Sequence, residues 1–430
     1  MWSIVEYLKK PELVVTVQEW FGIKYADSKA EKYMDKEGAL YDHNISPNLE
    51  RNQYSNYPEH KKHRRKQSDE SECVSTSNKT SDKNGSNETD IANKGYQITN
   101  KFWYYLFVIG TELGDELFYA TMIPFWFWNI DGAVGRRVVF VWSVVMYTGQ
   151  VLKDIIRWPR PGPPVKRLQN KWSIEYGMPS THAMVAVAMP FSVVIFMLDR
   201  YQFTATNGFM IAFVWCLVVC VSRIYLGMHS VADVIAGIVL TICLMIPLVP
   251  LIDRLDHFVL SSAFSPLFVI GIPILLITYY PCSDKWTPTR GDTTMIMSVT
   301  TGILIGAWLN YQLGAFQPPE LTSTRPYEII WPTHRMLGSM ILRTILGLCA
   351  VIATRALGKS IAYAFVCMLL GRDQNEVKAS ESTLENRDKI IVELSYKFFV
   401  YGSIGFIVNC LLPNVFKLLG IERPDFYTEI

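Results

Sequence analysis

Residues 206–233 read TNGFMIAFVWCLVVCVSRIYLGMHSVAD and decide the fold. The apolar run at the start of this stretch has the length that crosses a bilayer as a helix. It ends in Arg223, and His229 and Asp233 follow at the spacing S-R-x5-H-x3-D, just as the next apolar run begins. The stretch therefore predicts two membrane helices that meet at a cation, an imidazole and a carboxylate.

Apolar runs of this kind recur along most of the chain. Half of the 430 residues are hydrophobic and 19% are charged, against about 25% charged in a typical soluble domain. Because lipid offers no partners to bare backbone groups, the runs should form helices in one bundle. We expect an all-α polytopic membrane protein with about nine transmembrane helices, give or take one, and no internal repeat. The predicted spans are 103–128, 138–153, 182–198, 206–222, 231–251, 258–280, 293–313, 337–357 and 396–418.

Composition divides the chain into three parts. The segment Met1 to Lys24 mixes charge with apolar residues, which is typical of a short amphipathic helix or two and not of a span or a signal peptide. Residues 40–100 are rich in Asn, Ser, Lys, Asp and Glu, which predicts a disordered linker. The apolar stretch 360–370 is either the end of a long eighth helix or a re-entrant piece. We expect a tail over 1–101, a catalytic membrane core over 102–313 and C-terminal membrane helices over 314–430.

The net charge and the cysteines argue against several classes of function. A net charge of +2 is too small to indicate nucleic-acid binding. The basic run 61–66 is more typical of a solvated tail than of a lipid-surface contact. Five cysteines lie in apolar segments at no metal-ligand spacing, so we interpret them as small buried hydrophobic residues. They are Cys216, Cys220, Cys243, Cys349 and Cys410.

The loops predict the orientation of the bundle. Two spans precede Lys153, so the N-terminal tail and the motifs should lie on one side of the membrane. The opposite loops carry six arginines, whereas the short loop on the motif side holds Lys285 and Arg290 outside the motif region. The positive-inside tendency assigns the arginine-rich side to the cytosol, and the active site is then lumenal. The six arginines are Arg136, Arg137, Arg200, Arg254, Arg325 and Arg335. The sequons at Asn44, Asn78, Asn84 and Asn87 are usable only in a lumenal tail, which is weak support.

A second motif, K-x6-R-P, follows the predicted span 138–153. Lys153 offers a point charge and Arg160 a planar fork of donors, two complementary ways to hold a tetrahedral oxyanion. Pro161 and its neighbouring prolines prevent the helix from continuing. Basic residues after a span are, taken alone, more often interface anchors.

A third motif, Pro179-Ser180-Thr181-His182, comes directly before a span. A helix N-terminus presents free N–H groups and a partial positive charge, which suits phosphate. Ser180 adds a hydroxyl, and His182 would face the bound phosphate. The alternative makes Ser180 or Thr181 a simple helix cap and His182 a satisfied polar side chain.

His229 and Asp233 form an i, i+4 pair on one helix face. Asp233 can accept from one ring nitrogen of His229, which fixes the tautomer and leaves the other nitrogen free for nucleophilic attack. Such a pair at a helix start is often only structural. Here the carboxylate lies inside an apolar helix, where an unpartnered charge is costly, and this favours a functional reading.

Together, the three motifs resemble the type 2 phosphatidic acid phosphatase (PAP2) superfamily. The resemblance implies a six-helix catalytic core and phosphate ester hydrolysis without a metal or other cofactor. It implies that His229 forms a phosphohistidine, that Asp233 orients it, and that His182 is the acid and base. Phosphate binding is implied for Lys153, Arg160 and Arg223, assisted by Ser180 and Thr181. Many members carry Gly where this chain has Thr181.

Longer strings narrow the resemblance to the sphingosine-1-phosphate phosphatases. They imply an endoplasmic reticulum membrane enzyme that cleaves sphingoid-base 1-phosphates to the free base and phosphate. The strings are TELG at 111–114, DIIRWPRP at 154–161, YGMPSTHAM at 176–184, SRIYLGMHS at 222–230 and TRGDT at 289–293.

Three acidic residues in the first predicted span bear on the substrate. Glu112, Asp115 and Glu116 are spaced to share one helix face at a depth where charge is expensive. One hypothesis is that they receive the ammonium group of a sphingoid base. The alternative is an ion pair with an arginine such as Arg157, Arg223 or Arg343.

Other functions remain open at this point. Within the same fold, the alternatives are a broad-specificity lipid phosphate phosphatase and a sugar phosphate phosphatase. A different class is a non-catalytic lipid transporter or lipid-binding membrane protein, which a chain with about nine spans also resembles. The complete set of catalytic residue types favours the enzyme.

Overall fold

The chain is described from a computed structural model, over residues 2–25, 96–169, 171–281, 283–316, 327–329, 331–423 and 426. The predictions for the linker up to residue 95, for the four sequons and for the basic run 61–66 lie outside the described residues. The chain divides into two compact units. The first unit is Ile23–Thr99, and the second is the remainder of the chain. In the first, β1 (Ile23–Tyr25) pairs antiparallel with β2 (Tyr96–Ile98).

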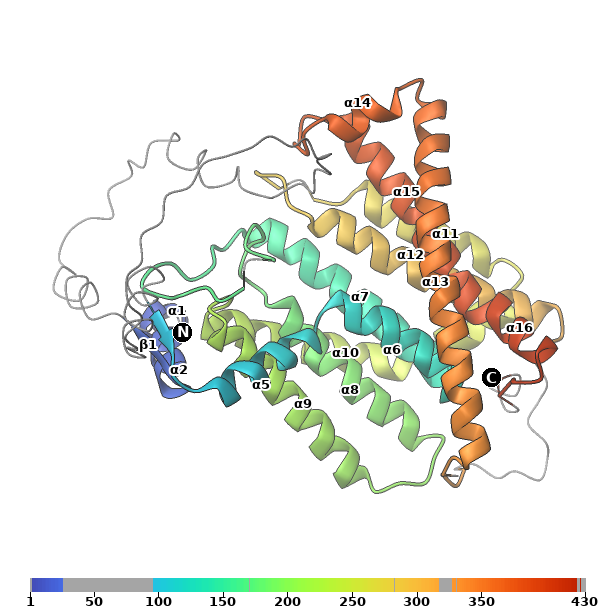
Figure 1. The fold of residues 1–430 in the computed structure, drawn as a ribbon, viewed down its shortest axis with the longest axis horizontal. Coiled ribbons are helices and arrows are strands. Elements are labelled where there is room, and N and C mark those ends of the chain that lie inside the picture. Colours follow the sequence, from blue (N-terminus) through green and yellow to red (C-terminus); the bar gives the residue numbers. More distant parts are fainter. Residues whose placement is uncertain are drawn as a thin grey trace, which may run out of the picture. The chain divides into compact units, whose positions relative to one another are not determined.

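The second unit is helical throughout its described elements. They are α1 (Trp2–Lys9), α2 (Pro11–Trp20), α5 (Lys101–Glu112), α6 (Glu116–Asn129), α7 (Gly132–Ile156), α8 (Thr181–Leu198), α9 (Ala205–Tyr225), α10 (Val231–Ser261), α11 (Ser265–Thr278), α12 (Thr289–Gln312), α13 (His334–Leu369), α14 (Gln374–Ala379), α15 (Arg387–Phe406), the π-helix η1 (Ile407–Leu411) and α16 (Leu412–Leu418). Figure 1 shows their arrangement.

Within the described part of the chain, seven helices are long and apolar enough to cross a membrane. They are α7, α8, α9, α10, α12, α13 and the stretch Arg387–Leu418. This confirms an all-α polytopic membrane protein, although not the expected number of nine spans. The predicted span 258–280 is realised as α11, a helix of only 14 residues. The stretch 360–370 continues α13 as far as Leu369, so the long-helix alternative is correct.

The predicted span 103–128 is interrupted. Helix α5 ends at Glu112, and α6 begins at Glu116 with Asp115 as its N-cap, so the expectation that these three carboxylates share one helix face is wrong. The turn also carries Gly114, where a Cβ atom would lie 2.9 Å from His182 Cδ2. The chain therefore turns between α5 and α6: Asp115 caps the start of α6, and Gly114 lets the turn lie close against α8.

Helices α7 to α10 alternate in direction, so the end of α7, the start of α8, the end of α9 and the start of α10 meet at one end of the bundle. Valines 134, 138, 141 and 145 recur along one face of α7 and pack on Met184 and Phe196 of α8 and on Met245 and Ile252 of α10. This core holds the four helix ends in register. Helices α1 and α2 lie at the same end, where Gln18 of α2 donates to the carbonyl oxygens of Lys166 and Tyr225, both at 2.8 Å (Figure 1).

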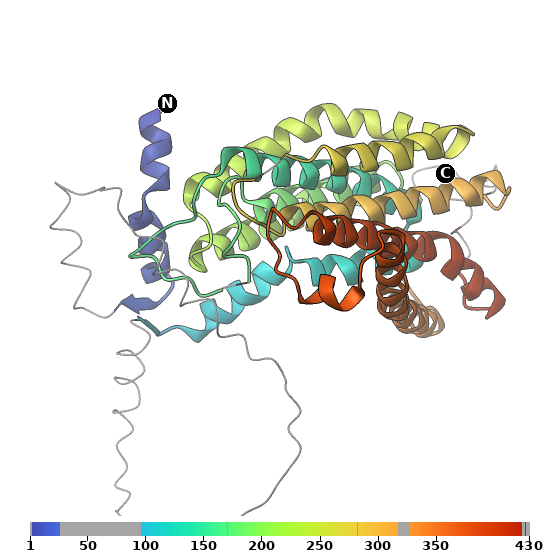
Figure 2. The ribbon, with the colours of Figure 1, turned by 90° about the horizontal axis from the view of Figure 1, so that it is seen from above.

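Helix α15 and the π-helix η1 pack closely on α12, as Figure 2 shows for α12 and α15. A Cβ atom on Gly302 would lie 2.0 Å from the carbonyl oxygen of Gly402, so the two backbones touch. Asn310 of α12 donates to Asn409 O at 3.0 Å, and Asn409 donates to Ile303 O at 2.9 Å. Backbone contact and buried amide bonds therefore fix α15 and η1 to α12.

Candidate active site

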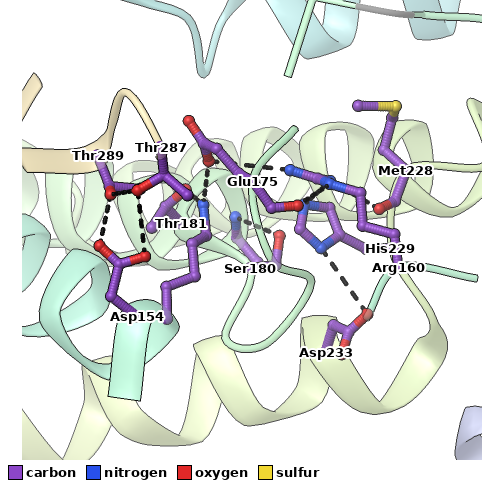
Figure 3. A network of polar contacts seen from close by, with 12 residues as sticks. Asp154, Arg160, Glu175, Ser180, Thr181, Met228, His229, Asp233, Thr287 and Thr289 are labelled. Carbon is purple, nitrogen blue, oxygen red and sulfur yellow. Dashed lines mark hydrogen bonds and ion pairs between the residues drawn. The ribbon is translucent and has the colours of Figure 1, made fainter. Parts of the chain in front are cut away.

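His229 lies between Arg160 and Asp233, in the short turn that joins α9 to α10 (Figure 3). Its Nε2 atom is 3.2 Å from Nη1 of Arg160. Because a guanidinium can only donate, Nε2 is the acceptor and the ring proton is on Nδ1. Nδ1 faces Asp233 Oδ2 at 3.8 Å, which is longer than a hydrogen bond. This tautomer leaves the lone pair of Nε2 directed into the cation cluster.

The surroundings of His229 keep its imidazole neutral. The side chain is 1% exposed. Burial, followed by the charges of Arg160 and Arg223, lowers the pKa of His229 well below its ordinary value of 6.5. An unprotonated imidazole is the form that can attack phosphorus.

Asp233 has a structural role as well as its place beside His229. Its Oδ2 accepts from the backbone N–H of Ser230 at 2.8 Å, and Ser230 Oγ accepts from the Asp233 N–H at 3.2 Å. The two residues form a capping box at the start of α10. Oδ1 is buried and has no hydrogen-bond partner among the described residues.

Arg223 presents unused donors. Its side chain is fully buried, and Nη1 donates to Thr111 Oγ1 at 2.6 Å and to Gln169 Oε1 at 3.0 Å. Its Nε and Nη2 atoms are buried without a hydrogen-bond partner in the described part of the chain, and so is Nε2 of His182. Buried donors without partners are costly, and an oxyanion would satisfy them.

The other two predicted phosphate-binding cations are partly engaged. Lys153 Nζ donates to Thr181 Oγ1 at 3.1 Å and to Glu175 Oε2 at 2.6 Å. Arg160 donates from Nε to the backbone oxygen of Glu175 at 2.9 Å and from Nη1 to Met228 O at 2.7 Å. Arg160 therefore ties the loop after α7 to the turn before α10, while Lys153 reaches the start of α8.

Ser180 is the N-cap of α8, and its Oγ accepts from the Ala183 N–H at 3.5 Å. Within the chain, the Ser180 hydroxyl therefore acts as a helix cap, as the alternative predicted. The Thr181 hydroxyl instead accepts from Lys153. The backbone N–H of Ser180 donates to Asp233 O at 3.0 Å, which joins the motif at 179–182 to the motif at 222–233.

Sequence reasoning missed Glu175. Its carboxylate is 5% exposed and lies within the cation cluster, 2.6 Å from Lys153 Nζ and 3.8 Å from Arg160 Nη2. The available signal was its position directly before the string at 176–184, inside an otherwise apolar and basic motif region.

Among the described residues, none of the three acidic side chains Glu112, Asp115 and Glu116 forms the ion pair with an arginine that the alternative predicted. Asp115 is buried and pairs with Lys171, whose Nζ is 2.8 and 2.9 Å from its two oxygens. Glu112 and Glu116 are exposed. Arg343 donates to Asn129 Oδ1 and to Ile421 O instead. Whether this group receives an ammonium stays a prediction.

An apolar cavity of about 250 Å³ lies between α6, α7, α8 and α9. It reaches Met189, seven residues beyond His182 on α8 and so about 10 Å along the helix. Apolar side chains make up nearly all of its lining, including Phe118, Ile123, Phe127, Val138, Val194, Ala212 and Trp215. Among the described residues, no group of three or more His, Cys, Asp or Glu side chains is placed to hold a metal ion.

Comparisons with known proteins agree with this geometry. Residues 135–256 match the PAP2 superfamily. The chain is 40% identical to sphingosine-1-phosphate phosphatase 1 of Rattus norvegicus, over 76% of this chain and 74% of that relative. It is 37% identical to sphingosine-1-phosphate phosphatase 2 of Mus musculus, over 77% of this chain and 92% of that relative.

A more distant relative is the lipid phosphate phosphatase delta of Arabidopsis thaliana, 24% identical over 71% of this chain and 80% of that protein. No solved structure matches the chain. The extent and identity of the nearer matches show the family. The chain belongs to the sphingosine-1-phosphate phosphatases of the PAP2 superfamily.

Proposed function

We propose that this protein hydrolyses sphingosine-1-phosphate and related sphingoid-base 1-phosphates to the free base and phosphate, through a phosphohistidine on His229. Family membership makes it a lipid phosphate phosphatase. The observation that carries the chemical proposal is the unprotonated Nε2 of His229, which lies 3.2 Å from Nη1 of Arg160, together with the buried donors of Arg223 that have no partner among the described residues.

The first step forms the phosphohistidine. Arg223, Lys153 and Arg160 hold the phosphate oxygens, and the lone pair of His229 Nε2 attacks phosphorus. The phosphorus–oxygen ester bond breaks, and protonated His182 gives its proton to the leaving alkoxide. Asp233 stabilises the positive charge that develops on the His229 ring.

The second step reverses the role of His182. The neutral imidazole takes a proton from water as the water oxygen attacks phosphorus. The phosphorus–nitrogen bond breaks, inorganic phosphate leaves, and the lone pair returns to His229. No step in this scheme requires a metal ion, so we propose that catalysis is metal-independent.

A lipid substrate agrees with the apolar cavity, which begins about 10 Å along α8 from His182. A hydrocarbon chain has apolar surface to bury there, whereas a sugar does not. The relatives named above act on sphingosine-1-phosphate or on lipid phosphates by name. We therefore propose a sphingoid phosphate, not a sugar phosphate, as the substrate. We also propose that residues 102–313 form the catalytic core.

We further propose that the protein resides in the endoplasmic reticulum membrane with the site on the lumenal side. The test is the mobility of the full chain after treatment with a glycosidase that removes N-linked glycans. A shift that disappears when Asn44, Asn78, Asn84 and Asn87 are all replaced by Gln supports a lumenal tail. Modification of cysteines introduced into the tail by an impermeant reagent added to intact microsomes contradicts it.

The decisive experiment measures phosphate release by purified wild type and His229→Ala in detergent containing EDTA. Sphingosine-1-phosphate, lysophosphatidate and glucose-6-phosphate are compared. We expect release from the sphingoid phosphate by the wild type, a loss of about 10⁴-fold or more in the variant, and acid-labile ³²P on the wild-type chain.

Activity that persists in His229→Ala contradicts the mechanism. Equal activity on glucose-6-phosphate contradicts the substrate class. The absence of both hydrolysis and label in the wild type favours the non-catalytic alternative.

A further inference from the structure

The carboxylate of Glu175 occupies the cluster that the phosphate group would enter. One oxygen, Oε2, is 2.6 Å from Lys153 Nζ and 3.8 Å from Arg160 Nη2. The other oxygen, Oε1, accepts no hydrogen bond within the described part of the chain, and Figure 3 shows it pointing away from Arg160. Glu175 therefore offers an acceptor beside the cations that hold phosphate.

Glu175 is fixed in this place by its backbone. Its carbonyl oxygen accepts from Arg160 Nε at 2.9 Å, and its N–H donates to Trp172 O at 3.3 Å. Two residues later, the N–H of Gly177 donates to Trp158 O at 2.7 Å. Because the chain is held on both sides, the backbone keeps Glu175 beside the cluster.

A fixed carboxylate is a disadvantage for binding an ordinary phosphate ester. Lys153, Arg160, Arg223 and protonated His182 supply the positive charges of the site, and Glu175 forms an ion pair with one of these groups, Lys153. A phosphate monoester brings close to two negative charges at neutral pH. The Glu175 carboxylate therefore repels the phosphate oxygens that approach Lys153, and this repulsion is poorly screened in a buried site.

A substrate with an ammonium group next to its phosphate removes this cost. In a sphingoid-base 1-phosphate, the amine is on the carbon adjacent to the phosphate-bearing carbon. Its positive charge offsets the repulsion between Glu175 and the phosphate, and its N–H groups can donate to Glu175 Oε1. A phosphate ester without an amine instead meets the carboxylate as a repulsive neighbour.

We propose that Glu175 is the residue that selects phosphate esters carrying an adjacent ammonium group, by receiving that group at Oε1 and by repelling esters that lack it. The inference rests on the proposed function and adds a specificity residue to it. Asp115 is less suited to this role because both of its oxygens already accept from Lys171, whereas only one oxygen of Glu175 is engaged among the described residues.

The test compares two substrates that differ at the amine, sphingosine-1-phosphate and its N-acetyl derivative, whose amide is uncharged. The measured quantity is the ratio of their kcat/KM values on purified protein. In Glu175→Gln the amide oxygen can still accept from Lys153, but the negative charge is gone. We expect the ratio to fall about tenfold or more, with an unchanged or higher kcat/KM for the N-acetyl substrate.

The matched control is Asp154→Asn. Asp154 is also a buried carboxylate, but among the described residues its side chain accepts from hydroxyls alone, those of Tyr280, Thr287 and Thr289. Its substitution should lower activity on both substrates alike. A Glu175→Gln ratio equal to that of the wild type overturns the proposal, whether both activities fall together or neither changes.

The wild type alone provides a second test if Glu175→Gln does not fold. Equal hydrolysis of the two substrates by the wild type overturns the role of Glu175 and leaves the phosphatase proposal intact. A wild type that releases phosphate from neither lipid refutes the proposed function itself. A preference for the free amine of about tenfold or more supports the proposal.

Discussion

The backbone N–H of Ser180 donates to the carbonyl oxygen of Asp233 at 3.0 Å. This bond joins the start of α8, which carries His182, to the first turn of α10, which follows His229. The two helix starts are as close as their backbones allow, because a Cβ atom on Gly237 would lie 2.7 Å from Ser180 O. The relative position of the two histidines therefore depends on a direct contact between backbones.

Gly237→Ala should separate the two helix starts. We expect a loss of about 1–3 kcal/mol in stability and a lower kcat, because an overpacked contact moves the backbone. Thermal unfolding followed by tryptophan fluorescence and a kinetic assay measure the two effects. Gly271→Ala on α11 is the control, because its Cβ atom meets nothing within 4 Å. Identical behaviour of the two variants contradicts the prediction.

Asp233→Asn should separate the two roles of this side chain. The amide oxygen can still accept from the Ser230 N–H, so thermal stability should change little. The kcat should fall about 10²-fold or more, because a neutral amide does not stabilise the His229 imidazolium. Ser230→Ala is the converse control: it loses about 1 kcal/mol of capping energy and keeps the carboxylate. A stable, fully active Asp233→Asn protein excludes the orienting role.

Arg223→Lys should lose affinity for phosphate while keeping the charge. A lysine cannot supply the two donors, Nε and Nη2, that are unpartnered in the described structure. We expect kcat/KM to fall roughly 10- to 100-fold, as for the loss of one charge-assisted hydrogen bond. Inhibition by orthovanadate should weaken in parallel. Arg137→Lys serves as the control, because Arg137 lies near the start of α7 and the site lies near its end. Equal effects of both substitutions contradict the role of Arg223 in phosphate binding.

The pH profile should report the lowered pKa of His229. The neutral imidazole is the active form, so activity persists as pH falls through the ordinary histidine value of about 6.5 and is lost only at lower pH. In Arg160→Gln the neighbouring charge is absent, the pKa of His229 rises, and inactivation begins at a higher pH. The ratio of variant to wild-type kcat/KM should therefore fall as pH decreases, since substrate ionisation cancels in this ratio. For Arg160→Lys, which keeps the charge, this ratio should not change with pH. A ratio that does not change with pH for Arg160→Gln argues against His229 as the nucleophile.

The apolar cavity should set the preferred chain length. Ala212 of α9 lines it and is buried, so Ala212→Phe fills part of the space. We expect kcat/KM for long-chain sphingoid phosphates to fall about tenfold, with little change for short-chain analogues. Val214→Phe, two residues along α9 and 52% exposed, is the control. A uniform loss across chain lengths means that the hydrocarbon chain binds elsewhere.

The sequence predicted the parts of the site that lie within one span or one motif. Arg223, His229 and Asp233 are separated by a fixed short spacing, so a helix end, a turn and a helix start bring them together without information from distant segments. The placement of Lys153 and His182 at helix ends followed from the alternation of apolar runs. The interruption after Glu112 was missed, because an apolar run long enough to span does not reveal that Asp115 caps a second helix.

Glu175 and the pair Asp115–Lys171 were decided only by tertiary packing. Both arise where the loop between α7 and α8 lies against segments distant in sequence, and one sequence gives no rule for that contact. The sequence by itself determined a membrane bundle with cations and histidines at one end, because hydrophobic length and local spacing act along the chain. Only the folded structure decided which buried charges neutralise one another, because a charge partner is set by distance in space.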